Sequence, residues 1–142
     1  MQTRVLIIAL LTGLSAFAQR GGSQTINANI RGGGGDGKCT IEVEVDGVAD
    51  VEIRGTQARI RTLQGGRATF RRFDCNQPMP NRPFDFRFNG VDGRGRQSLV
   101  QNPGNGGPAV VRIEDRQGGR EGYTFDLRWR GGNGNYDRRR PY

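Results

Sequence analysis

The sequence predicts an all-β protein: a single antiparallel β-sandwich of roughly eight or nine short strands, with a small β-barrel as the alternative. Three observations support this prediction. Apolar residues recur at every second position through most of residues 39–129. Clusters of Gly, Pro and Asn separate the alternating runs, and no stretch longer than a turn has apolar residues at helical spacing.

Residues 1–18 form a predicted secretory signal rather than part of the fold. Arg4 supplies a positive start, Val5–Leu11 an apolar run, and Ala16–Ala18 a small-residue cleavage site after Ala18. The apolar run is far shorter than the roughly 20 residues of a transmembrane helix. The chain is therefore expected to be secreted or periplasmic, with no membrane span.

Residues 19–37 read as a Gly-rich linker. Within it Thr25–Ile30 alternates and predicts a short edge strand, whereas Arg31–Gly37 predicts flexible coil. A glycine-rich loop can hold phosphate where it leads into a helix. Neither a helical pattern nor a Gly-Lys-Ser/Thr ending follows here, so no phosphate loop is expected.

The sandwich domain is predicted at residues 38–130, beginning with strands over 39–46 and 49–54. Their inward residues are all odd-numbered, so a hairpin between them requires a three-residue loop, Asp46–Val48, or a bulge. That hairpin would place Glu42 and Glu44 beside the acids of the second strand. Arginines are the expected neutraliser of these like charges, and a bound calcium ion is the alternative.

A two-residue type II′ turn is predicted at Gly55–Thr56, because the next strand has even-numbered inward residues. This register sets Glu52 opposite Arg59 and Asp50 opposite Arg61. The four residues are predicted cross-strand ion pairs, each contributing about 0.2 to 1 kcal/mol.

A disulfide is predicted between Cys39 and Cys75, the only two cysteines of an exported chain. Both lie on inward faces, since a further strand covers residues 68–75 after a turn at 64–67. In the chain-entropy model, closing this segment stabilises the fold by about 4 kcal/mol.

The second half of the domain is organised around residues 109–129, where the alternation is clearest. Val111 and Ile113 share one face and, after a Gly-rich break, so do the aromatic residues, which predicts a half-buried antiparallel hairpin. Upstream, 76–83 and 102–108 are loops, while 84–88 and 96–101 are strands. One inward face per strand allows six aromatic residues to be buried together: Phe84, Phe86, Phe88, Tyr123, Phe125 and Trp129. Residues 131–142 predict a disordered Arg/Gly tail.

Composition argues against an enzyme. The chain has no histidine, and Ser23 and Ser98 are the only serines after the signal, so a Ser-His or Cys-His nucleophile is impossible. No zinc-ligand spacing exists, and the acids fall on outward strand faces beside arginines. No catalytic residue, metal or cofactor is predicted.

The charge balance instead indicates binding to anions. Removal of the signal takes away Arg4 and no acid, so 21 basic and 14 acidic residues leave a net charge of +7. All but Lys38 of these cations are arginine, whose planar fork of donors suits carboxylate, sulfate and phosphate groups. The candidate polyanion-binding residues are Arg71, Arg72, Arg94, Arg96, Arg138, Arg139 and Arg140.

The leading expectation is therefore a non-enzymatic, exported binding module for anionic glycans or other extracellular polyanions. The export signal argues against an intracellular nucleic-acid partner. One alternative is a module for neutral glycans that uses exposed aromatic residues. Another is a structural envelope or matrix component that self-associates through edge strands, and the sequence leaves the oligomeric state open.

The chain resembles small secreted bacterial proteins of uncharacterised function in four segments: Gly93–Gly95, Val110–Asp115, Gly118–Gly119 and Tyr123–Trp129. The resemblance covers the last part of the predicted domain. It implies an exported β domain and carries no activity.

Overall fold

The computed structural model describes residues 23–131 and is almost entirely β-structure. The predicted signal (1–18) and most of the predicted tail (132–142) lie outside the described residues. The strands are β1 (Ser23–Asn27), β2 (Asn29–Ile30), β3 (Gly37–Arg54), β4 (Gln57–Cys75), β5 (Phe84–Asp92), β6 (Arg96–Gln101), β7 (Ala109–Asp115) and β8 (Glu121–Arg130). One 3₁₀ turn, η2 (Pro103–Asn105), precedes β7, and the all-β prediction is confirmed.

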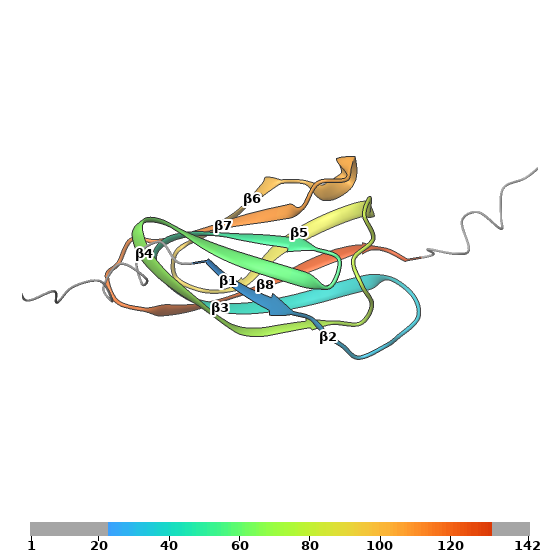
Figure 1. Ribbon diagram of the computed structural model, residues 1–142, viewed down its shortest axis with the longest axis horizontal. Helices are drawn as coiled ribbons and strands as arrows, with labels where there is room; N and C mark the ends of the chain where they lie inside the picture. The colour runs from blue at the N-terminus through green and yellow to red at the C-terminus, as the bar shows by residue number, and fades with distance from the viewer. Residues whose placement is uncertain (1–22, 132–142) are drawn as a thin grey trace, which may run out of the picture.

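The long hairpin of β3 and β4 builds the fold (Figure 1). These strands pair from Cys39 opposite Cys75 to Arg54 opposite Gln57, around the predicted two-residue turn. Gly55 has φ +58°, as the first position of a type II′ turn requires.

Both long strands bend near their midpoints, so the hairpin folds back on itself (Figure 1). At the bend the backbones nearly touch: a Cβ on Gly47 would lie 3.1 Å from Gly66 Cα, and one on Gly66 would lie 2.8 Å from Asp46 O. The predicted chain reversals at 46–48 and 64–67 are therefore wrong. Gly47 lies instead at a register shift within one continuous strand, whose inward positions keep the same parity on both sides.

The bend divides the sheet into two layers. In the first layer, the turn-proximal halves of β3 and β4 pair with β7 and β1, and β6 adds to β7. In the second layer, the other halves pair with β8 and with the short parallel strand β2, and β5 adds to β8. β5 and β6 pair with β8 and β7 rather than with each other, so the sheet stays open, as in a sandwich.

The predicted hairpin between β7 and β8 does not form, although both strands alternate as expected. β7 pairs with Gly47–Ile53 of β3 and β8 with Gly37–Val45, so the two strands lie in different layers. The connection between them crosses from layer to layer and has positive φ at Gly118 and Gly119. The alternation of apolar residues predicts which face of a strand is buried, but it does not predict which strand pairs with it. The hairpin prediction was wrong for this reason.

The core lies between the two layers and includes the predicted disulfide. Cys39 and Cys75 are directly opposite and buried, so the bridge joins the open end of the long hairpin. At the same end, Met79 from the 76–83 loop is buried between the layers, and its N–H donates to Gly55 O over 3.4 Å. The largest fully buried side chains are Trp129, Tyr123, Phe125, Ile41, Ile53, Ile60, Ile113 and Leu127.

Only half of the predicted aromatic cluster is fully buried. The three aromatic residues of β8 are buried, whereas Phe86 and Phe88 are only partly buried and Phe84 is 59% exposed. Asp85 has φ +55°, and an irregularity between Phe84 and Arg87 breaks the alternation. β5 is also an edge strand, and Phe84 at its start is not enclosed by the core.

Candidate anion-binding groove

The outer face of the second layer carries a central set of carboxylates with cations around them. Alternation places Glu42 and Glu44 of β3 outward, flanked by Asp74 of β4 and Asp126 of β8. Every one of these acids has at least one basic side chain within 4 Å. These basic residues are Arg31, Lys38, Arg71, Arg72, Arg120 and Arg128.

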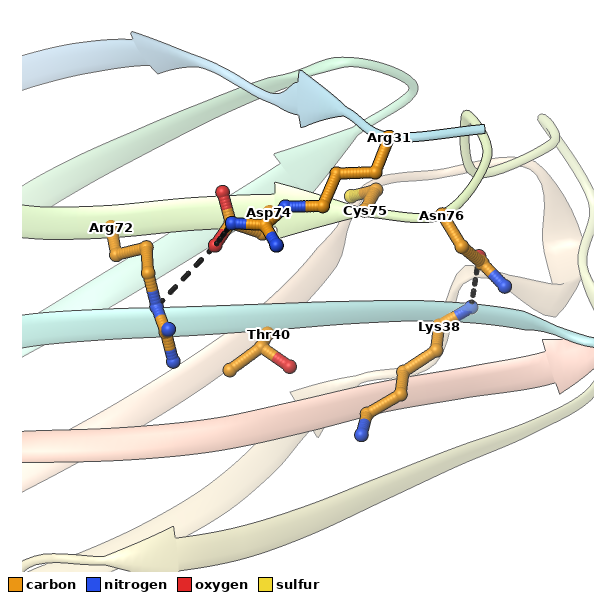
Figure 2. A pocket seen from close by; sticks show the side chains of 7 residues that line it. All are labelled: Arg31, Lys38, Thr40, Arg72, Asp74, Cys75 and Asn76. Carbon is orange, nitrogen blue, oxygen red and sulfur yellow. Dashed lines mark hydrogen bonds and ion pairs between the residues drawn. The ribbon is translucent and has the colours of Figure 1, made fainter. Parts of the chain in front are cut away.

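One part of this face is hollowed into a groove of about 260 Å³ (Figure 2). We call it the Arg31–Arg72 groove. Arg31 follows β2 and reaches over the end of β4, while Lys38 and Thr40 point outward from β3. The lining residues are Arg31, Lys38, Thr40, Arg72, Asp74, Cys75 and Asn76.

Backbone contacts beside the disulfide hold the groove in shape. The Asn76 side chain accepts a hydrogen bond from Lys38 N over 2.8 Å and donates one to Asp36 O over 2.8 Å. Asn76 N donates to Lys38 O, and Arg31 N donates to Cys75 O. The segments that carry Arg31 and Lys38 are thereby tied to the end of β4.

The cations of the groove are only loosely paired. Arg31 Nη2 is 3.7 Å and Arg72 Nε is 3.5 Å from the same oxygen, Asp74 Oδ2. Arg72 Nε is also 3.7 Å from Glu42 Oε2, and Lys38 Nζ is 3.8 Å from Asp126 Oδ2. These separations exceed the 2.7–3.2 Å of a normal N–H···O hydrogen bond. The Arg31 and Arg72 side chains are 70% and 49% exposed, so both remain accessible from solvent.

Arg112 on the first layer shows the contrasting, saturated arrangement. Its Nε and Nη2 donate to the two carboxylate oxygens of Asp50 over 2.8 and 3.0 Å. The hydrogen bond and the charge of Asp50 raise the pKa of Arg112 above its usual value. A guanidinium held by a bidentate pair has a structural role, whereas the guanidiniums of the Arg31–Arg72 groove have N–H groups left to donate to an additional oxyanion.

A second groove of about 460 Å³ continues from the first and shares Lys38 and Asn76 with it. It adds three arginines: Arg87, Arg128 and Arg130. Its acids are engaged, since Asp36 Oδ1 accepts from Gly131 N over 3.0 Å and Asp85 lies 3.5 Å from Arg87. A continuous, open and basic track of this kind suits a linear polymer better than an enclosed small molecule.

The residues predicted to bind polyanions are distributed over the fold. Arg72 lines the groove, and Arg71 is the extra residue of a bulge in β4, paired with Glu44. Arg96 begins β6 of the first layer, near the bend of β3, and Arg94 lies just before it, with its Nε 3.2 Å from Glu121 Oε1. The remaining three, Arg138, Arg139 and Arg140, lie outside the described residues.

Sequence reasoning missed Arg31 and Lys38. Arg31 stands in a Gly-rich run and was expected to be coil, but the parallel pairing of β2 brings it to Asp74. The outward position of Lys38 follows from the alternation around Cys39. Lys38 lies close to Asn76 because Cys39 is opposite Cys75. The predicted disulfide between these two cysteines therefore already implied that Lys38 and Asn76 are close.

The register of the predicted ion pairs is confirmed, while their contacts differ. Glu52 is opposite Arg59 and Asp50 is opposite Arg61, as expected. However, Arg61 Nη2 bonds diagonally to Glu52 Oε1 over 3.2 Å, because Asp50 is already engaged by Arg112. Within residues 23–131, Arg59 has no carboxylate partner within 4 Å.

The expected cluster of like charges does not form. The bend places Glu42 and Glu44 in the second layer and Asp50 and Glu52 in the first, so the repulsion that called for arginine or calcium is absent. In the described part of the chain, no group of three or more His, Cys, Asp or Glu residues is placed to hold a metal ion.

The Gly-Arg-Gly and tyrosine motifs have a structural role. Tyr123 OH accepts a hydrogen bond from Gly95 N over 3.1 Å and lies 3.4 Å from Glu121 Oε2. A Cβ on Gly93 or Gly95 would overlap the Tyr123 side chain. Burial, followed by the nearby charges of Asp115 and Glu121, raises the pKa of Tyr123 to about 12.

Across the described residues, no helix has the length and apolar character needed to cross a membrane. Comparison with known proteins found no matching family model, no matching curated protein and no matching solved structure.

Proposed function

We propose that the protein is an exported, non-enzymatic module that binds anionic polysaccharides through the Arg31–Arg72 groove and its continuation. One observation carries the proposal: two exposed guanidiniums share a single carboxylate at distances longer than hydrogen bonds. Sulfate or carboxylate groups of a glycan would complete the coordination of these donors by charge-assisted hydrogen bonds.

The aromatic residues favour anionic glycans over the other classes of ligand. Trp129 is 2% exposed and Tyr123 and Phe125 are fully buried, so these rings cannot stack on neutral sugars or on unpaired bases. Phe84 is the one exposed aromatic side chain of residues 23–131, and Arg130 lies over its ring, 5.9 Å from the centroid. Recognition by charge is the mode that remains.

An extracellular or periplasmic site of action fits this ligand class. The intramolecular disulfide is typical of oxidising compartments, where anionic envelope and matrix polymers are found. The predicted signal at residues 1–18 supports the same localisation.

The test is binding of the mature chain, residues 19–142, to dextran sulfate and to uncharged dextran over a range of salt concentrations. We expect binding to dextran sulfate alone, with affinity falling steeply as salt rises, because counterion release drives such binding. Arg31→Gln/Arg72→Gln should lower the affinity by about tenfold and the slope of log affinity against log salt by about 2.

The matched control is Arg94→Gln/Arg116→Gln. It removes the same charge near the bend of β3, where Arg94 Nε is 3.2 Å from Glu121 Oε1 and Arg116 Nη2 is 3.0 Å from Glu114 Oε2. The control should retain near-wild-type affinity. Binding that is independent of salt, absent altogether, or equally weakened by the control would contradict the proposal.

A further inference from the structure

The outer face of the first layer has a basic groove of its own. It occupies about 310 Å³ beside the Gly55–Thr56 turn, and we call it the Arg54–Arg59 groove. Its lining residues are Glu52, Arg54, Gln57, Ala58, Arg59 and Pro108. The only acid among them, Glu52, is engaged by Arg61 at 3.2 Å.

Arg54 and Arg59 are the least neutralised cations of this face. Within the described residues, neither has a carboxylate within 4 Å, whereas Arg61 and Arg112 on the same face are held by Glu52 and Asp50. Both are exposed, and alternation directs them away from the core, since Ile53 and Ala58 beside them are buried. The Arg54–Arg59 groove therefore presents free guanidinium donors to solvent.

The two basic grooves lie on opposite sides of the sandwich. Lys38 belongs to the second layer and Arg54 to the first, and the bend at Gly47 brings these two ends of β3 to the same end of the molecule (Figure 1). Between the layers is the core, where Ile41 and Ile53 are completely buried. Packed sheets are about 10 Å apart, so a polymer segment lying along one outer face cannot contact the other.

We propose that the protein is bivalent and cross-links anionic polysaccharide chains, holding one chain in the Arg31–Arg72 groove and a second in the Arg54–Arg59 groove. This inference rests on the proposed function and adds the second site and its consequence. Charge complementarity makes a second chain of the same polymer the occupant of the second groove. Two weak sites on one rigid body give a linked network far greater stability than either contact alone.

The test is a bridging assay with the mature chain. The protein is bound to beads coated with dextran sulfate, washed, and then exposed to fluorescent dextran sulfate in solution. The wild type should recruit the fluorescent polymer. Arg54→Gln/Arg59→Gln should bind the beads within about threefold of wild type but recruit at least about tenfold less polymer, because its second groove is lost.

The control variant Arg94→Gln/Arg116→Gln should recruit polymer as the wild type does. If the wild type binds the beads but recruits nothing, cross-linking is wrong and the proposed function remains. Failure to bind the beads at all would remove the proposed function as well.

Two further results would also overturn the inference. One is undiminished recruitment by Arg54→Gln/Arg59→Gln together with a dimer by light scattering, because two copies joined elsewhere would then supply the bridge. The other is recruitment of labelled duplex DNA in preference to dextran sulfate, which would assign the Arg54–Arg59 groove to nucleic acid.

Discussion

Replacing Gly37 with alanine should disturb the packing of the only tryptophan. Gly37 is opposite Trp129 in the β3–β8 pairing, and the indole lies directly against its backbone. A Cβ at this position would overlap Cε2, Nε1 and Cζ2 of the ring, so the ring must move. Gly37→Ala therefore tests whether Trp129 is held in the core, which is the main argument against an aromatic sugar-binding platform.

Two limits bracket the loss of unfolding free energy expected for Gly37→Ala. Overpacking a well-formed core costs about 1 to 3 kcal/mol. Complete expulsion of a side chain that buries about 150 to 250 Å², at about 25 cal/mol per Å², costs about 4 to 6 kcal/mol. Because the contact involves the body of the indole against backbone, we expect a loss of at least about 2 kcal/mol.

Urea unfolding followed by tryptophan fluorescence measures this loss, and the emission of the folded variant should shift to the red. The matched control is Gly122→Ala on β8, where a Cβ would meet nothing within 4 Å. That control should stay within about 0.5 kcal/mol of wild type or gain slightly from the stiffer unfolded chain. Equal stability of the two variants would refute the packing of Trp129 on Gly37.

Three further perturbations test separate parts of the fold. Cys39→Ala/Cys75→Ala should lower the free energy of unfolding by about 4 kcal/mol. In calorimetry, the reduced wild type should unfold at a lower Tm than the oxidised wild type. Unchanged values would contradict the stabilising role of the disulfide. Because the pKa of Tyr123 is raised from 10.0 to about 12, the folded state retains the phenol proton in this interval. Stability should therefore fall as pH rises through that window, and Tyr123→Phe should flatten the fall in alkaline urea titrations. Arg112→Gln removes both hydrogen bonds to Asp50 and should cost about 1 kcal/mol, and a double-mutant cycle with Asp50→Asn should show strong non-additivity.

The period of two predicted the buried faces well, because the side-chain period of a strand depends on local geometry alone. In β3 the inward residues are odd-numbered on both sides of the bend, and all of them are buried. Strand partners were not predictable in the same way. Whether Gly47 ends a strand or bends it depends on the close approach of Gly66, which is distant in sequence.

The candidate site was predictable only in part, for the same reason. Arg72 was identified from its charge, whereas Arg31 reaches the groove only because β2 pairs in parallel with the end of β4. Charge alone also groups Arg94 and Arg96 with Arg72, but they lie near the bend of β3, whereas Arg72 lies toward the disulfide end of β4. Composition indicates how many cations are available, and tertiary structure decides which of them remain unpaired.

Because β3 and β4 run through both layers, we expect the two layers to unfold together. Neither layer has a long central strand of its own, so one cannot melt while the other persists. Amide hydrogen exchange in the two halves of β3 should therefore proceed at similar, globally limited rates, with early exchange confined to the edge strands β1, β2, β5 and β6. In the proposed cross-linking role, the same strand would connect the two grooves, since Lys38 and Arg54 both belong to β3.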